Sequence, residues 1–92
     1  MEWTTEKLAE VERLGALFYS VKKIAIIMEA DAAELQALYA DEQSPFYKSY
    51  MRGFLKTDAE IRTSEIGMAK RGSTPAQDSV KKYIDDAKHE NL

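Results

Sequence analysis

The feature that most constrains this chain is a long stretch of helical character, from Pro45 to about Arg71, with no internal stop signal. Only two prolines occur, Pro45 and Pro75, and each follows a Ser or Thr that can cap a helix N-terminus. Gly72 can take the left-handed conformation that ends a helix. A helix of this length spans roughly 40 Å at ~1.5 Å per residue. Three short helices cannot cover it, so part of its surface needs another partner.

Four further helices are predicted around this long one, and no alternating run is long enough for a strand. Thr4 or Thr5, Ser20 and Asp31 are the expected N-caps of the first three helices. The expected class is all-α, with a three-helix helix-turn-helix unit at residues 1–43 and a helical hairpin at residues 44–92. We expect the tail from His89 to Leu92 to fray. The predicted short helices run from about Glu6 to Phe18, Val21 to Met28, Ala32 to Ala40 and Pro75 to Lys88.

The spacing around residues 24–38 is typical of a helix-turn-helix. Ala25 provides the small residue at which two helices cross, and Glu29 occupies the turn position that favours positive φ. A non-glycine residue there costs about 1 kcal/mol. The alternative is that any three short packed helices give similar spacing. The pattern therefore predicts the shape of a helix-turn-helix but does not by itself predict DNA binding. The apolar positions that flank the turn and recur after it are Ile24, Met28, Ala30, Leu35 and Leu38.

Charge is unevenly distributed along the chain, whose formal net charge is −3. Residues 1–44 hold four Lys or Arg against nine Asp or Glu, a net −5. Phosphate contacts supply most non-specific DNA affinity, so the acidic second helix of the motif would be a poor reader of DNA alone. The alternative for each basic residue is a solvated helix face. The candidate DNA-binding residues are Lys22, Lys23, Gln36, Tyr39, Lys48 and Arg52.

The long helix carries two further patterns. Aromatic residues cluster at Phe46, Tyr47, Tyr50 and Phe54, and we expect them to pack against the first three helices rather than stack on bases. Small residues lie along one line and favour close approach of another helix, with a local kink as the alternative. That line consists of Ser49, Gly53, Thr57, Ser64 and Gly67.

The last helix folds back beside the long one, because residues 72–74 make a short connection. Its single apolar stripe covers only part of the long helix, and exposed apolar surface of this kind usually marks an interface. We therefore expect a homo-oligomer. The candidate interface residues are Phe54, Ile61, Met68, Val80, Tyr83 and Ile84.

The residues of enzyme sites are missing from the sequence. There is no cysteine, His89 is the only histidine, and no phosphate-binding or nucleophile motif occurs. We expect no catalysis, no cofactor and no metal. The longest apolar run, Ile24 to Met28, is too short to span a bilayer, and the start is not that of a signal peptide. These features favour a cytoplasmic protein, in a bacterial or infected host cell, with no membrane partner.

Two segments beside the predicted motif carry a resemblance to a known family. They run from Ser44 through Gly53 and from Ala69 through Gln77. With them the chain resembles the small terminase subunits of tailed phages over roughly residues 5 to 88. The resemblance implies a helical DNA-binding domain joined to a hairpin that assembles into a ring. It also implies that double-stranded viral DNA is delivered to a large packaging-motor subunit, which holds the ATPase and the nuclease.

Three functions remain open at this point. The first is a phage or prophage DNA-packaging adaptor, and the second is a helical protein-interaction module whose degenerate helix-turn-helix no longer binds DNA. The third is a small transcriptional regulator. The family usually continues beyond the hairpin into a segment that contacts the motor, so the chain would be a compact version, a truncated one or a prophage relic.

Overall fold

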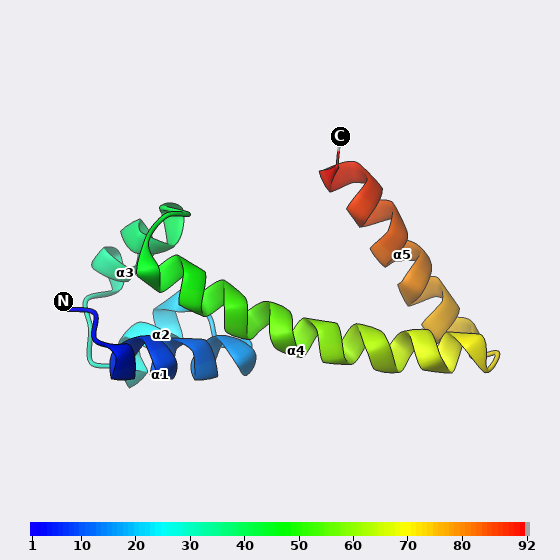
Figure 1. The fold of residues 1–92 in the computed structure, drawn as a ribbon, viewed down its shortest axis with the longest axis horizontal. Coiled ribbons are helices and arrows are strands. Elements are labelled where there is room, and N and C mark those ends of the chain that lie inside the picture. The colour runs from blue at the N-terminus through cyan, green and yellow to red at the C-terminus, as the bar shows by residue number, and fades with distance from the viewer. Residues whose placement is uncertain (92) are drawn as a thin grey trace. The chain divides into compact units, whose positions relative to one another are not determined.

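The computed structural model describes residues 1–91, and this part of the chain contains α-helices and no strand (Figure 1). The predicted all-α class is confirmed. The starts of all five helices lie within one residue of those predicted. None of the described helices combines the length and apolar character needed to cross a bilayer. The helices are α1 (Thr5–Ala16), α2 (Val21–Ile27), α3 (Ala32–Ala40), α4 (Pro45–Lys70) and α5 (Thr74–Glu90).

The chain forms two compact units that divide inside α4. Unit 1 is Met1–Thr57, and unit 2 begins at Asp58. The predicted boundary at 43/44 differs from this division by about half of α4. The reason is that the first half of α4 carries Phe46 and Tyr50 into the core formed with α1, α2 and α3.

Hydroxyl and carboxylate side chains cap the starts of the helices, as predicted. The Asp31 carboxylate accepts a hydrogen bond from the Glu34 backbone N–H at 2.9 Å. Ser44 is buried, accepts from the Tyr47 N–H at 3.0 Å and donates to the Leu38 carbonyl at 2.7 Å. It therefore joins the end of α3 to the start of α4. The other N-caps are Thr4, Ser20 and Ser73.

Three helices end in the same way, with a residue of positive φ that reverses the chain. These residues are Phe18 (φ 63°), Glu29 (φ 54°) and Gly72 (φ 99°). The predicted conformations of Glu29 and Gly72 are confirmed. The predicted end of the first helix at Phe18 is wrong, because α1 stops at Ala16 and Phe18 is already in the turn.

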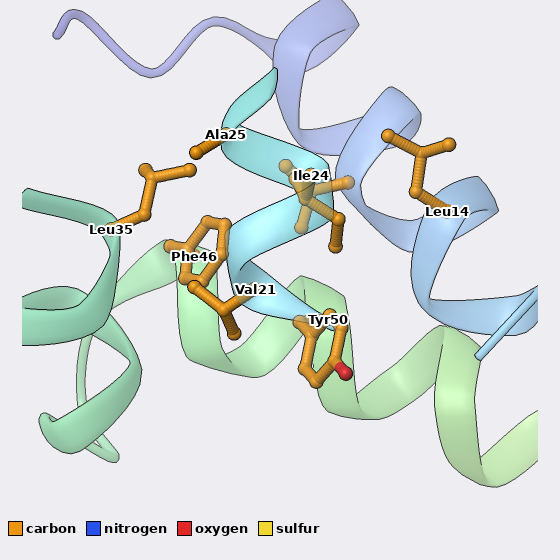
Figure 2. Packing of buried hydrophobic residues seen from close by; sticks show 8 residues of the cluster. Leu14, Val21, Ile24, Ala25, Leu35, Phe46 and Tyr50 are labelled. Carbon is orange, nitrogen blue, oxygen red and sulfur yellow. The ribbon is translucent and has the colours of Figure 1, made fainter. Parts of the chain in front are cut away.

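The core of unit 1 is built from all four of its helices. Figure 2 shows Ile24 of α2, Leu35 of α3 and Phe46 of α4 in one buried cluster, and each is fully buried. Tyr50 completes it, and its hydroxyl donates to the Tyr19 carbonyl at 2.8 Å. The predicted packing of the aromatic cluster at the start of α4 is confirmed. Ile27, the last residue of α2, is 45% exposed.

Helices α1 and α4 approach each other closely in unit 1. A Cβ at Gly53 would overlap the Glu12 carbonyl oxygen, and one at Gly15 would overlap that of Tyr50. The Thr57 hydroxyl donates to the Ala16 carbonyl at 2.6 Å. The predicted close approach of another helix to the line of small residues is thus present at Gly53, and the approaching helix is α1. Gly67 differs, because a Cβ there would meet nothing within 4 Å.

Unit 2 consists of the second half of α4 and the returning α5. Gln77 donates to the Ala69 carbonyl at 3.1 Å, and Tyr83 donates to Glu65 at 2.6 Å. The predicted return of the last helix is confirmed by these contacts. Fraying was predicted for the tail from His89 to Leu92. This prediction is wrong for His89 and Glu90, which still belong to α5. Leu92 lies outside the described residues.

Candidate nucleic-acid interface and self-association surface

Helices α2 and α3 pack against each other across a turn that backbone hydrogen bonds close. The Ala30 N–H donates to the Ala25 carbonyl at 2.9 Å, and the Glu29 N–H donates to the Ile26 carbonyl at 3.3 Å. The two bonds form the pattern of a Schellman ending, and the bond from Ala30 depends on the positive φ of Glu29. The turn is thus held by backbone contacts, and the Glu29 side chain stays exposed to solvent.

The outward face of α3 has few polar side chains that could donate hydrogen bonds to DNA bases or phosphates. Gln36 is exposed, and between Lys23 and Lys48 the sequence holds no Lys or Arg. Tyr39 is 38% exposed, but its ring lies 5.8 Å from that of Tyr47 and 5.6 Å from that of Tyr50. Its ring therefore contributes to packing, and only its outer edge is open to a partner.

Basic side chains reach the surface of unit 1 from two places. Lys22 and Lys23 are exposed in the first turn of α2. Lys48 and Arg52 lie on α4 and line a groove that α1 closes on the other side. The structure thus brings Lys48 and Arg52 together, while Lys22 and Lys23 form a separate pair on another helix.

Arg52 does not present a free positive charge. Its guanidinium lies 3.2 Å from the Glu12 carboxylate, which lines the same groove. An exposed ion pair of this kind stabilises the fold little. It neutralises one of the two positive charges that line the groove, so that Lys48 remains to attract a phosphate. Of the four basic residues predicted to bind DNA, Lys22, Lys23 and Lys48 are exposed and form no ion pair with the described residues.

The residues predicted for self-association are divided between the two units. Phe54 belongs to unit 1, where its ring centre lies 4.7 Å from that of Phe18 and it packs against the core. In unit 2, Ile61, Met68 and Ile84 are each at least 39% exposed. Val80 and Tyr83 are half-buried between α4 and α5. Of the residues predicted for self-association, those that are exposed therefore all lie in unit 2, and Phe54 is not among them.

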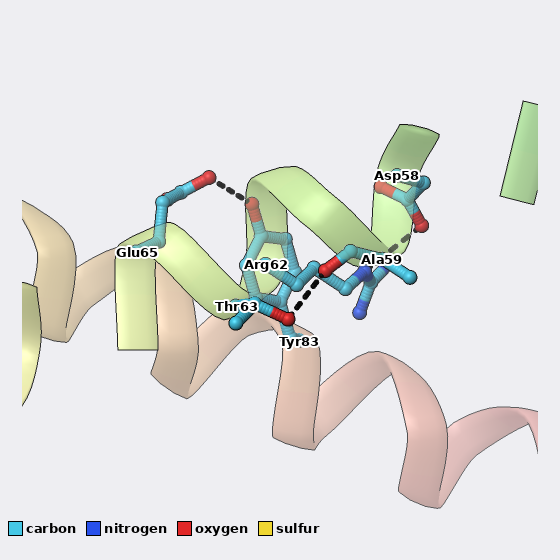
Figure 3. Close-up of polar contacts among 6 residues, drawn as sticks. All are labelled: Asp58, Ala59, Arg62, Thr63, Glu65 and Tyr83. Carbon is cyan, nitrogen blue, oxygen red and sulfur yellow. Dashed lines mark hydrogen bonds and ion pairs between the residues drawn. The ribbon is translucent and has the colours of Figure 1, made fainter. Parts of the chain in front are cut away.

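A polar cluster joins α5 to α4 inside unit 2 (Figure 3). The Arg62 guanidinium lies 4.0 Å from the centre of the Tyr83 ring and donates to Asp58 at 2.9 Å. The hydrogen bond from Tyr83 lowers the pKa of the Glu65 carboxyl, and one from Ser79 adds to this effect. The same bond raises the pKa of the Tyr83 hydroxyl. The sequence pattern assigns Tyr83 to the candidate interface and does not predict this cluster; the signal for it is the pair Arg62 and Glu65, three residues apart on α4.

Comparisons with known proteins identify no relative: no family model, no curated protein and no solved structure matches this chain. Within the described residues no group of three or more His, Cys, Asp or Glu side chains is placed to hold a metal ion. Two surfaces of the described residues are candidates for function: the basic pair on α2 with the α2–α3 turn, and the exposed apolar residues of unit 2.

Proposed function

We propose that this protein is a self-assembling DNA-binding protein of the small-terminase kind, which delivers double-stranded DNA to a packaging motor. Unit 1 binds the duplex, and unit 2 joins copies of the chain. The observation that carries the proposal is the α2–α3 pair, joined by a turn in which Glu29 takes positive φ, with Lys22 and Lys23 exposed in the first turn of α2. The resemblance of residues 5 to 88 to small terminase subunits supplies the packaging role.

Assembly is supported by how little unit 2 buries. Among residues 58–91 only Ala76 is buried, while apolar side chains on both α4 and α5 stay open. Two helices without a core are marginal in water, because helical stability in proteins comes chiefly from packing of an apolar face. Contact between copies would supply the missing packing. It would also multiply a weak affinity for DNA, because linked sites bind the same duplex together.

Measurement of DNA affinity against salt concentration tests the DNA-binding part. Each phosphate contact contributes a slope of about −0.9 to log K against log salt. We expect the double variant Lys22→Ala/Lys23→Ala to reduce the magnitude of the slope by about 2. Lys7→Ala is the matched control, because Lys7 lies on α1 between acidic residues and should leave the slope unchanged.

A second candidate function is a helical protein-interaction module that does not bind DNA. It is favoured by the net −5 of residues 1–44 and by the pairing of Arg52 with Glu12. Absence of duplex binding at low salt, in a protein that still self-associates, would support this candidate and contradict the first. A dimer that recognises one palindromic site would instead indicate a transcriptional regulator.

A further inference from the structure

The outer flank of α5 carries charges of alternating sign. Asp78, Lys81, Asp85 and Lys88 are all exposed, and none of them forms an ion pair with another described residue. Their spacing of three, four and three residues places them along one side of the helix. From Asp78 to Lys88 the charges are negative, positive, negative and positive. In the reverse direction the order is positive, negative, positive and negative, so two copies of the flank that run in opposite directions are complementary.

An apolar strip lies beside these charges. Ile84 is 49% exposed and Val80 is half-buried, and both line a shallow groove on this flank of unit 2. Asp78 and Lys81 form part of the same lining, together with Gln77 and Ala69. Apolar residues with charges at their rim are the usual composition of a helix–helix seam. The strip adjoins the side of α5 that contacts α4, where Tyr83 donates to Glu65, and Ile84 is its most exposed member.

We propose that this flank is the contact between two copies of the chain, in which α5 packs antiparallel against α5 of the partner subunit. A two-fold axis near residue 83 sets Asp78 opposite Lys88 of the partner subunit and Lys81 opposite Asp85 of the partner subunit. All four cross-copy pairs then have opposite sign. A parallel in-register pair would set each charge against its own kind, which is destabilising.

The inference rests on the self-association in the proposed function and adds its partner, orientation and register. Such a contact is isologous, since the same patch serves both copies, and by itself it closes a dimer rather than the ring that the resemblance implies. It covers Val80 and Ile84 with the same residues of the partner subunit. It therefore gives unit 2 the apolar packing that Ala76, the single buried residue among residues 58–91, does not provide.

Cysteine cross-linking tests the orientation, because the natural sequence contains no cysteine. In the antiparallel pair, position 84 lies one residue from the axis, so Ile84→Cys should form a covalent dimer under mild oxidation. Gln77→Cys lies six residues from the axis, and its two copies stand about 18 Å apart along the helices. That exceeds the ~7 Å Cα separation that a disulfide tolerates, so this variant should remain uncross-linked. A cross-linked Gln77→Cys dimer would overturn the antiparallel arrangement, because a parallel in-register pair brings both position 77 and position 84 close to their own copies.

Charge reversal tests the same contact without touching its apolar strip. Lys81→Glu/Lys88→Glu makes the flank wholly acidic, and Asp78→Lys/Asp85→Lys makes it wholly basic. By sedimentation, each should weaken self-association at least tenfold, and an equimolar mixture should restore it. Far-UV circular dichroism serves as the control for folding. Unchanged association of the acidic variant would overturn the α5 contact while leaving the proposed function intact, and a strictly monomeric natural chain would overturn both.

Discussion

Gly53 of α4 lies so close to Glu12 of α1 that a Cβ at position 53 would overlap the Glu12 carbonyl oxygen. This contact fixes how the first half of α4 joins unit 1. The neighbouring Thr57 hydroxyl donates to the Ala16 carbonyl at 2.6 Å, one helical turn further along both helices. Together they explain why unit 1 extends to Thr57 and does not end where α4 begins.

Gly53→Ala should destabilise unit 1 by about 1–3 kcal/mol, because the added methyl group meets rigid backbone. The check is urea unfolding followed by the fluorescence of Trp3, which packs against Phe46 in the core of this unit. Gly67→Ala is the matched control. It lies in the same helix with open space around it and should gain up to about 1 kcal/mol in helix propensity. Equal effects at the two positions would contradict the close α1–α4 packing.

Glu29→Gly should raise the stability of unit 1 by about 0.5–1 kcal/mol. Glu29 has φ 54°, a conformation that glycine adopts without the steric cost of a Cβ. Thermal unfolding measures the change. Ala33→Gly is the matched control, because it also introduces a glycine, on the exposed face of α3. It should lower the stability by about 1 kcal/mol. A loss of stability in Glu29→Gly would show that the turn does not require this backbone conformation.

Tyr50→Phe should cost about 1 kcal/mol, because it removes the hydroxyl that donates to the Tyr19 carbonyl at 2.8 Å. That bond holds the turn between α1 and α2 against α4. Burial raises the pKa of the Tyr50 hydroxyl, and the neighbouring Tyr39 adds a smaller contribution. Tyr47→Phe is the control, since the Tyr47 hydroxyl forms no hydrogen bond with the described residues, and chemical denaturation should show it close to the natural protein.

Acid should loosen the contact between α5 and α4 in unit 2. The hydrogen bond from Tyr83 lowers the pKa of Glu65 below its ordinary value of 4.5 in the folded chain. The folded state therefore favours the ionised carboxylate, and the stabilisation is present above that ordinary value. It is lost as the pH falls through the lower, folded pKa. Amide NMR shifts of α5, followed during an acid titration, should report this step.

Glu65→Gln should remove the acid-dependent step, because the amide that replaces the carboxyl does not titrate in this range. Glu60→Gln is the matched control. It removes an exposed carboxylate of the same helix with no hydrogen bond to α5, so the step should remain. An identical titration of α5 in the Glu65→Gln variant and the natural chain would contradict the assignment.

Local chemistry made much of the fold predictable. Ser20, Asp31 and Ser73 cap helices because their side chains satisfy backbone N–H groups a few residues away, which sequence alone reveals. Glu29 and Gly72 were located by their distance from neighbouring helical patterns. Phe18 was misplaced because its spacing continues the apolar stripe of α1, whereas its ring packs on Phe54, far along the chain.

By itself the sequence determined the helices, their order and most of their ends, since these depend on residues within a turn or two of one another. Only the tertiary structure decided how the small residues of α4 are used, with Gly53 closed against α1 and Gly67 left open. It likewise separated Phe54 from Ile61, although both lie on one heptad line. Such choices depend on contacts between residues distant in the chain, and no periodicity within a single helix encodes which distant partner will cover its face.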